Sequence, residues 1–279
     1  MLIGGQQESD ELPGLVRRPV VLAAYFANRR LGCGHGPRRY EALRGRGQPS
    51  LWAATEVVTP RWPSIASMAT THTQLFVAFE GGDGAGKSTQ VRLLAEALRR
   101  LRLDVLQTRQ PGGTELGARL RDLVLHGDHV SPRAEALLYA ADKAHHVDTV
   151  VRPALARGEV VVTDRYVDSA IAYQGAGRDL GADEVATIQH WAVGDLMPDL
   201  TVVLDVAAET GRSRRGDVHD RLEAEGDEFH EAVRAHFVAL AKADPDRYLL
   251  VDATLPADEI HAQVLDHLGS RSLVPEGGP

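Results

Sequence analysis

Short apolar runs and helical periodicities alternate along the chain from residue 75 onward. Residues 75–79 form an unbroken apolar run, which is typical of a strand buried on both faces of a sheet. Four further runs predict strands at 104–108, 159–163, 201–205 and 248–251. Apolar residues recur at helical spacing over 91–101, 116–125, 132–155 and 257–268. Strands that alternate with helices in this way predict an α/β fold with a five-stranded parallel sheet flanked by helices.

A glycine-rich segment follows the first predicted strand and has the spacing Gly81-x4-Gly86-Lys87-Ser88. Glycines allow successive backbone N–H groups to turn toward phosphate oxygens, and the N-terminus of the next helix adds positive potential. In this P-loop pattern the lysine neutralises the β- and γ-phosphates, and the serine hydroxyl ligates Mg²⁺. An ordinary glycine-rich turn is the alternative, but the strand before it and the helix after it favour the P-loop. The predicted ATP-binding residues are Gly81, Gly82, Asp83, Gly84, Ala85, Gly86, Lys87, Ser88 and Thr89.

Charged residues also end two of the other predicted strands. Arg109 follows the second strand, and Asp164 and Arg165 follow the third. In parallel α/β sheets, the carboxyl ends of the strands face the crevice that binds ligands. A carboxylate at such a position commonly provides a second anchor for Mg²⁺, and an arginine there can hold a phosphate. A solvated arginine and a local Asp–Arg ion pair are the alternatives.

Four arginines fall within ten residues after the fourth predicted strand: Arg212, Arg214, Arg215 and Arg221. One interpretation is a solvated helix face. The other is a lid that brings arginines onto a triphosphate, since phosphoryl transfer requires charge neutralisation and exclusion of water.

Composition narrows the class of protein. Of the 279 residues, 43% are hydrophobic and 25% are charged, which is typical of a soluble globular protein. No apolar run approaches the roughly 18 residues that span a bilayer, so no membrane partner is expected. The single cysteine, Cys33, excludes an internal disulfide framework and fits a cytoplasmic location. A net charge of −8 provides no overall basic field for nucleic acid, and no Cys/His spacing indicates zinc.

The charge is unevenly distributed, and this sets the expected domain boundaries. Residues 1–72 carry nine Arg against five Asp or Glu, a net charge of +4, whereas the remainder carries −12. With little periodic apolar surface, 1–72 is expected to be a disordered extension. The alternatives are a basic targeting or nucleic-acid-binding arm, and an untranslated segment with the native start at Met68. The predicted P-loop domain is 73–270, followed by a disordered tail at 271–279.

Taken together, the motifs at 79–89, 109–114, 164–169, 172–175, 197–200 and 220–223 resemble those of thymidylate kinases. The resemblance covers about 74–268 and implies a sheet of the P-loop nucleoside-triphosphate-hydrolase type with a short arginine-bearing lid. It implies transfer of a phosphoryl group from ATP to dTMP, giving dTDP and ADP with Mg²⁺ as cofactor. It also implies a homodimer.

The resemblance assigns roles to individual residues. Lys87 and Ser88 are expected to bind ATP, and Ser88 and Asp164 to bind Mg²⁺. Asp83 is expected near the ligands of the Mg²⁺ ion and near the nucleoside 3′-hydroxyl. Transition-state charge is expected to be met by Lys87 and Arg165 and by the lid arginines Arg212, Arg214 and Arg215. The expected dTMP-binding residues are Asp83, Arg109, Tyr139, Lys143, Arg165, Ala170, Tyr173 and Gln174. Within this set, Tyr139 stacks on thymine, Tyr173 excludes a ribose 2′-hydroxyl, and Gln174 belongs to the wall beside the base.

Four positions depart from the common family pattern. Gln110 replaces Glu, Tyr139 replaces Phe, Lys143 replaces Arg, and Ala170 stands where Ser, Thr or Asn is frequent. A lysine keeps the charge of an arginine but loses its forked hydrogen-bonding geometry. The acceptor therefore stays open between dTMP and another pyrimidine monophosphate such as dUMP. An ATP-binding regulatory protein without transfer activity is the alternative from a different class.

Overall fold

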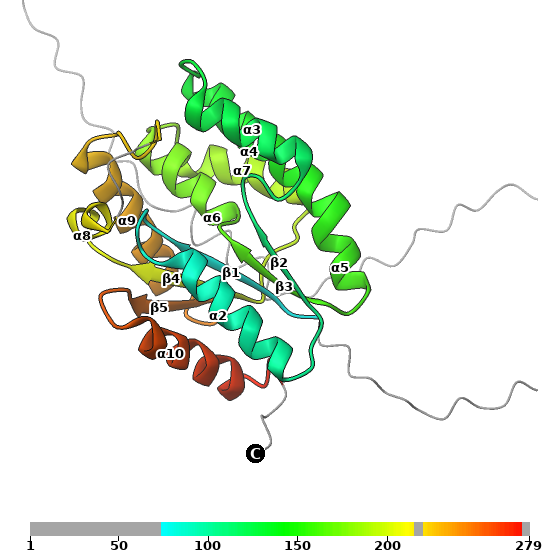
Figure 1. Cartoon of the computed structure of the whole chain (residues 1–279). Helices are drawn as coiled ribbons and strands as arrows, with labels where there is room; N and C mark the ends of the chain where they lie inside the picture. Colours follow the sequence, from blue (N-terminus) through cyan, green and yellow to red (C-terminus); the bar gives the residue numbers. More distant parts are fainter. Residues whose placement is uncertain (1–73, 215–219, 275–279) are drawn as a thin grey trace, which may run out of the picture. The chain divides into compact units, whose positions relative to one another are not determined.

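Strand β1 (Phe76–Gly81) lies at the centre of a five-stranded parallel sheet with the order β2-β3-β1-β4-β5 (Figure 1). The other strands are β2 (Val105–Arg109), β3 (Val160–Asp164), β4 (Leu200–Asp205) and β5 (Tyr248–Asp252). This confirms the predicted α/β class and all five predicted strands. The computed structural model describes residues 74–214 and 220–274. The expectations for 1–72, for Met68, for Arg215 and for 275–279 lie outside these residues.

The alternation of side chains along β1 divides the core into two layers. Val77 and Phe79 pack with Leu94 of α2 (Lys87–Arg100) and Val264 of α10 (Ala257–Ser270). Phe76 and Ala78 point to the opposite face, where they join apolar residues of the helices that follow β2 and β3. All six residues of β1 are buried because helices cover both faces of the sheet.

The second face is covered by the helices that shape the site. They are α3 (Glu115–His126), α4 (Pro132–His146), η1 (Val147–Val151), α5 (Arg152–Ala156), α6 (Val167–Ala170), η2 (Ile171–Gly177) and α7 (Ala182–Val193). Two further helices, α8 (Ala208–Ser213) and α9 (Asp227–Ala243), follow β4. Neither α7 nor α9 is among the helices predicted from the sequence.

The helix predicted over 132–155 is interrupted by the wide turn η1. Pro153 stands at the start of α5, immediately after this turn. A proline has no N–H to donate and its ring clashes with the carbonyl four residues earlier, so the backbone widens there. The structure therefore replaces one predicted helix by α4, η1 and α5.

Parallel pairing brings the ends of three strands to one edge of the sheet. Phe79 of β1 pairs with Asp164 of β3, and Arg109 of β2 pairs with the same Asp164. The P-loop, which follows β1, therefore lies beside the two strand ends that carry Arg109 and Asp164. None of the helices in the part of the chain described here has the length and apolar composition needed to cross a membrane.

Candidate active site

The P-loop joins β1 to α2 and surrounds the ammonium group of Lys87. Gly86 precedes α2 with a left-handed φ of 93°, a conformation that glycine adopts without steric cost. Lys87 Nζ donates to the carbonyl oxygens of Gly81 and Gly82 at 3.2 and 2.6 Å. Burial is the main cause that lowers the Lys87 pKa from 10.5 to about 8. The lysine is thus held inside the loop, where its charge faces the groups that the loop binds.

Ser88 and Asp164 come together from α2 and β3. Ser88 Oγ donates to Asp164 Oδ2 at 2.5 Å, so a hydroxyl and a carboxylate oxygen are adjacent at the pocket beside the P-loop. Within 74–214 and 220–274, no group of three or more His, Cys, Asp or Glu could hold a metal ion. A pair of oxygen ligands is nevertheless the type of protein site that Mg²⁺ uses when phosphates and water complete its coordination.

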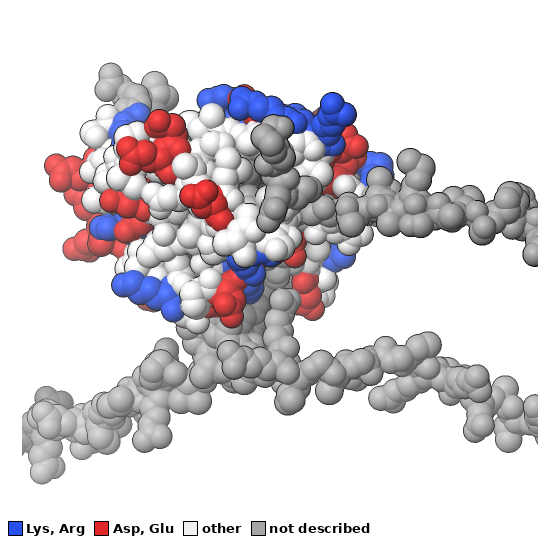
Figure 2. All heavy atoms as spheres, turned by 90° about the horizontal axis from the view of Figure 1, so that it is seen from below, with Lys and Arg blue, Asp and Glu red and all other residues white. Residues whose placement is uncertain are grey.

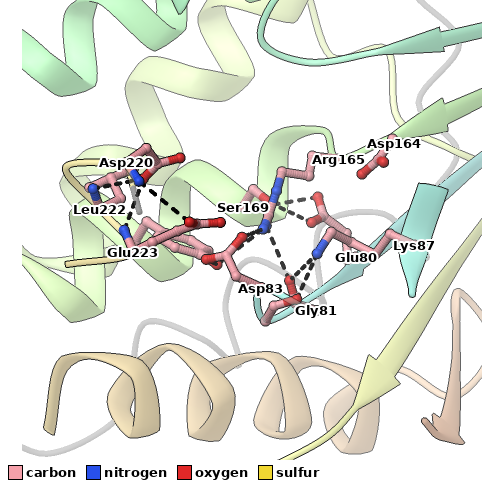
Figure 3. A network of polar contacts seen from close by, with 12 residues as sticks. Glu80, Gly81, Asp83, Lys87, Asp164, Arg165, Ser169, Asp220, Leu222 and Glu223 are labelled. Atoms are coloured by element: carbon pink, nitrogen blue, oxygen red, sulfur yellow. Dashed lines mark hydrogen bonds and ion pairs between the residues drawn. The ribbon is translucent and has the colours of Figure 1, made fainter. Parts of the chain in front are cut away.

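Arg165 occupies the centre of the site (Figure 3). Its φ of 67° is left-handed, which is uncommon for a residue other than glycine. Nη1 donates to Gly81 O at 3.1 Å and to Ser169 Oγ at 2.9 Å, while Nη2 donates to Asp83 Oδ1 at 2.5 Å. Tyr173 OH donates to Asp83 Oδ2 at 2.7 Å and accepts from Arg165 Nη2 at 3.1 Å. Arg165, Asp83 and Tyr173 therefore form one hydrogen-bonded group.

Glu80 supports the turn that carries Arg165 (Figure 3). This carboxylate is fully buried and accepts from Tyr166 N at 2.8 Å, Ser169 N at 3.1 Å and Ser169 Oγ at 2.5 Å. Burial is the main cause that raises its pKa above the ordinary glutamate value. Glu80 has no role in the sequence-based prediction, although its place near the end of β1 brings it beneath the turn that follows β3.

Two adjoining pockets open at this edge of the sheet. The larger, with an empty volume of about 930 Å³, lies at the P-loop and is lined by Asp83, Gly84, Gly86, Lys87, Ser88, Thr89, Arg109, Gln110, Arg121, Asp164, Arg165 and Arg214. We call it the donor pocket. Three predicted ATP-binding residues, Gly81, Gly82 and Ala85, do not line it.

The second pocket, with an empty volume of about 580 Å³, includes seven of the eight predicted dTMP-binding residues. We call it the acceptor pocket. It is lined by Asp83, Gln110, Pro111, Arg121, Leu125, Tyr139, Lys143, Arg165, Tyr166, Ser169, Ala170, Tyr173, Gln174, Asp220, Leu222 and Glu223. The eighth, Arg109, lines the donor pocket instead. The two pockets share Asp83, Gln110, Arg121 and Arg165.

One end of the acceptor pocket carries a buried cation. Lys143 is only 2% exposed, and its Nζ lies 5.6 Å from the centre of the Tyr139 ring. Burial is the main cause that lowers the Lys143 pKa from 10.5 to about 8. Among the residues that the structure describes, Lys143 Nζ has no hydrogen-bond acceptor and no ion-pair partner within 4.0 Å. It is therefore available to an acceptor atom of a ligand.

The predicted lid arginines differ in where they lie. Arg214 lines the donor pocket and donates to Ala253 O at 2.8 Å, whereas Arg212 pairs with Asp227 and lines neither pocket. After the lid, Asp220 Oδ1 accepts from Glu223 N at 2.9 Å, and Asp220 N donates to Glu223 Oε2 at 3.4 Å. This reciprocal pair holds a turn that forms part of the acceptor pocket. Arg121, Asp220 and Glu223 line the acceptor pocket but were not predicted as site residues, although 220–223 is one of the motifs that carry the family resemblance.

A P-loop pocket and a second pocket that share two arginines, Arg121 and Arg165, define the class of protein. Phosphoryl transfer requires a donor on the P-loop, an acceptor in line with it, and positive charge between them. The fold and the site are those of a P-loop phosphotransferase that acts on a small acceptor.

Comparison with known proteins identifies the family. The family model described as thymidylate kinase matches residues 79–264. A thymidylate kinase of Leifsonia xyli subsp. xyli is 56% identical over 210 residues, which are 74% of this chain and 99% of that protein. A thymidylate kinase of Clavibacter sepedonicus is 54% identical over 196 residues, 69% of this chain and 93% of that protein. The crystal structure of thymidylate kinase from Ehrlichia chaffeensis matches with a TM-score of 0.58 at 30% identity, covering 70% of this chain and 98% of that chain.

The chain belongs to the thymidylate kinase family. It is a nucleoside monophosphate kinase, and its reaction is the ATP-dependent phosphorylation of dTMP to dTDP. The resemblance stated from the sequence motifs is confirmed, as are the predicted fold and enzyme class.

Proposed function

We propose that the phosphoryl group passes between the two pockets, with ATP on the P-loop and dTMP between Tyr139, Lys143 and Tyr173. The observation that carries this proposal is the position of Arg165, which lines both pockets together with Asp83. A guanidinium group at this junction can contact both the transferred phosphoryl group and the acceptor phosphate. Because this chemistry depends mainly on orientation and charge, no separate general base is required.

On the donor side, Lys87 provides the first positive charge. Its hydrogen bonds to Gly81 O and Gly82 O place the ammonium group where phosphate oxygens can take over as acceptors. Arg214 contributes from the lid side of the same pocket. We assign transition-state charge to Lys87, Arg165 and Arg214, and we keep Arg212 as a candidate that must leave Asp227 to take part.

Ser88 and Asp164 fit Mg²⁺ and are the residues that we propose to hold it. Their adjacent oxygen atoms offer the hard ligands that this ion prefers, and they lie in the donor pocket. When bound, the ion neutralises charge on the β- and γ-phosphates. Asp83 lines both pockets, and we propose that it helps to order water near the ion.

On the acceptor side, Arg165 is proposed to hold the monophosphate and the Asp83–Tyr173 pair to contact the 3′ side of the sugar. Arg109 lines the donor pocket only, so we keep it as a candidate that must reach across the junction to grip the same phosphate. Tyr173 is buried in the wall of the acceptor pocket, and we propose that its ring excludes a 2′-hydroxyl. Tyr139 and Lys143 are proposed to contact the base by stacking and by hydrogen bonding to a carbonyl oxygen.

The test is coupled ADP release with Mg²⁺–ATP against dTMP, dUMP, dCMP and UMP. We expect the highest kcat/KM with dTMP, and a fall of about a hundredfold or more for Arg165→Lys, because lysine loses the forked geometry. Arg157→Lys is the matched control, since Arg157 forms a surface ion pair with Glu159 at 2.6 Å. Preference for another acceptor would contradict the base assignment. Unchanged kinetics of Arg165→Lys would contradict the assigned junction.

We also propose that the chain forms a homodimer in the cytoplasm. Leu116 and Leu123 of α3, Leu137 of α4 and Trp191 of α7 are large, exposed apolar residues, and these helices pack side by side. Size-exclusion chromatography with light scattering should give a dimer for the chain and a monomer for Trp191→Glu. A monomeric parent chain would contradict this proposal.

We keep the predicted domain assignment, with one kinase domain at 73–270, as a proposal. Neither a membrane nor a nucleic acid is a proposed partner. On the face shown in Figure 2, acidic and basic side chains both occur, with uncharged surface between them.

A further inference from the structure

A completely buried carboxylate lies behind the base end of the acceptor pocket. Glu135, in the first turn of α4, is 0% exposed and does not line the pocket. Its Oε1 accepts from Gln174 Nε2 at 2.9 Å and lies 3.5 Å from Arg178 Nε, while its Oε2 accepts from Arg221 Nη2. Burial of a charged group is costly unless it is paired, so this position requires the two arginines.

The residues that bind the Glu135 carboxylate come from separate segments of the chain and have further contacts of their own. Arg178 follows η2 and also pairs with Glu225 at 2.5 Å, which balances the two positive charges with two negative ones. Arg221 follows the lid, and its Nε donates to Val124 O of α3 at 2.9 Å. The carboxylate therefore has a fixed position relative to the wall of the pocket.

Glu135 determines which way the amide of Gln174 points. A carboxylate between two guanidinium groups accepts hydrogen bonds and donates none, so the amide NH₂ of Gln174 must face it. The carbonyl oxygen of the same amide then faces the other way, and Gln174 lines the acceptor pocket. Within the described part of the chain, Gln174 Oε1 has no hydrogen-bond donor. The pocket therefore presents an acceptor at Gln174 and, at Lys143, a donor.

This pattern matches one kind of pyrimidine edge. Thymine and uracil carry a carbonyl oxygen at position 4, which suits Lys143, beside an N–H at position 3, which suits Gln174. In the same pose cytosine turns an amino group toward Lys143 and an unprotonated nitrogen toward the Gln174 oxygen, so both its groups conflict. A site that leaves buried polar groups unpaired discriminates strongly against the wrong ligand.

We propose that Glu135 is a positioning residue that orients Gln174 and thereby sets the preference for 4-keto over 4-amino pyrimidine monophosphates. The inference rests on the proposed placement of the base between Tyr139 and Lys143. Glu135 does not touch the substrate and acts through Gln174.

The experiment compares kcat/KM for dTMP and dCMP in the full-length chain and in Glu135→Gln. A glutamine at this position can accept or donate, so the amide of Gln174 is free to turn over. We expect the dTMP-to-dCMP ratio to fall about tenfold or more, which corresponds to loss of one buried hydrogen bond. A general loss of folded enzyme lowers both values equally and does not move the ratio.

Glu225→Gln is the matched control because it makes the same change beside Arg178 without touching Gln174. It should keep the parent ratio. The coupling is tested in a Gln174→Met background, where Glu135→Gln should have no further effect on the ratio. If Glu135→Gln does not fold, Glu135→Asp keeps the charge but shortens the side chain, and it should also lower the ratio.

A parent ratio retained in folded Glu135→Gln or Glu135→Asp would overturn the inference. So would a further loss of the ratio in the Gln174→Met background. A parent chain that does not prefer dTMP over dCMP would instead contradict the proposed placement of the base, which separates the two failures.

Discussion

Lys143→Met should stabilise the folded protein while impairing its use of dTMP. Lys143 is 2% exposed, and among the described residues its ammonium has no hydrogen-bond acceptor or ion-pair partner within 4.0 Å. Burial, opposed in part by Asp142, lowers its pKa from 10.5 to about 8. Methionine has a similar length and carries no charge, so it fills the same space without the cost of burying an ammonium group.

The magnitude follows from the pKa. The fall of the pKa from 10.5 to about 8 means that the charged form of Lys143 lowers the free energy of unfolding at neutral pH by about 3 kcal/mol, compared with an uncharged side chain. In a domain of this size, 1 kcal/mol shifts the melting temperature by about 2–4 °C, so we expect a rise of roughly 5 °C or more.

The same linkage predicts a pH dependence with a definite sign. The folded pKa lies below the unfolded one, so the folded state releases its proton first as the pH rises. The parent chain therefore gains stability between about pH 8 and 10.5, and the advantage of Lys143→Met shrinks in that window.

The assay is thermal unfolding of both chains from pH 7 to 10, with dTMP kinetics at pH 7. Lys242→Met is the control, because Lys242 is exposed and its removal should leave the melting temperature nearly unchanged. The kcat/KM for dTMP should fall about tenfold or more with the loss of the donor. An equal or lower melting temperature for Lys143→Met at pH 7, or an advantage that does not change with pH, would refute the reasoning.

Three further predictions concern the reaction itself. Ser88→Ala removes the hydroxyl that lies 2.5 Å from Asp164, so kcat should fall about a hundredfold or more. The variant should also need a higher Mg²⁺ concentration for half-maximal activity. A Mg²⁺ titration like that of the parent chain would argue against the proposed ion site. Arg214→Ala should raise the KM for ATP by about tenfold and leave the KM for dTMP within about twofold, because of the two pockets Arg214 lines only the donor pocket. The measurement is steady-state kinetics with each substrate varied in turn. A rise confined to the KM for dTMP would contradict this prediction. Tyr173→Phe removes the hydroxyl bonded to Asp83 and Arg165 but keeps the ring. It should lower kcat/KM for dTMP about tenfold while UMP stays a poor acceptor; a gain in UMP use would show that the hydroxyl, rather than the ring, excludes the 2′-hydroxyl.

Much of the fold could be predicted from the sequence because its signals are local. An apolar run of five residues and a P-loop spacing of glycines followed by a lysine are both properties of short segments. They identified all five strands and the P-loop. The same locality explains one failure: the interruption at η1 depends on Pro153 acting within a helix that otherwise has continuous periodicity. Helix α9 was missed although its buried residues Val233, Phe237 and Ala241 recur at helical spacing.

The sequence by itself determined the five strands in their order along the chain, several of the helices between them, the chemistry at the strand ends and the family of the chain. Only the tertiary structure decided which side chains meet. Glu80 lies beneath Ser169, 89 positions away in the chain, and Glu135 reaches Arg221 across 86 positions. Arg214 faces the donor pocket while Arg212, two residues earlier, pairs with Asp227. These contacts join segments that come together only when helices pack on the sheet, and the burial of Lys143 follows from the same packing. Short-range sequence patterns do not predict contacts between residues that are far apart in the chain, because the packing of whole helices and strands determines which side chains meet.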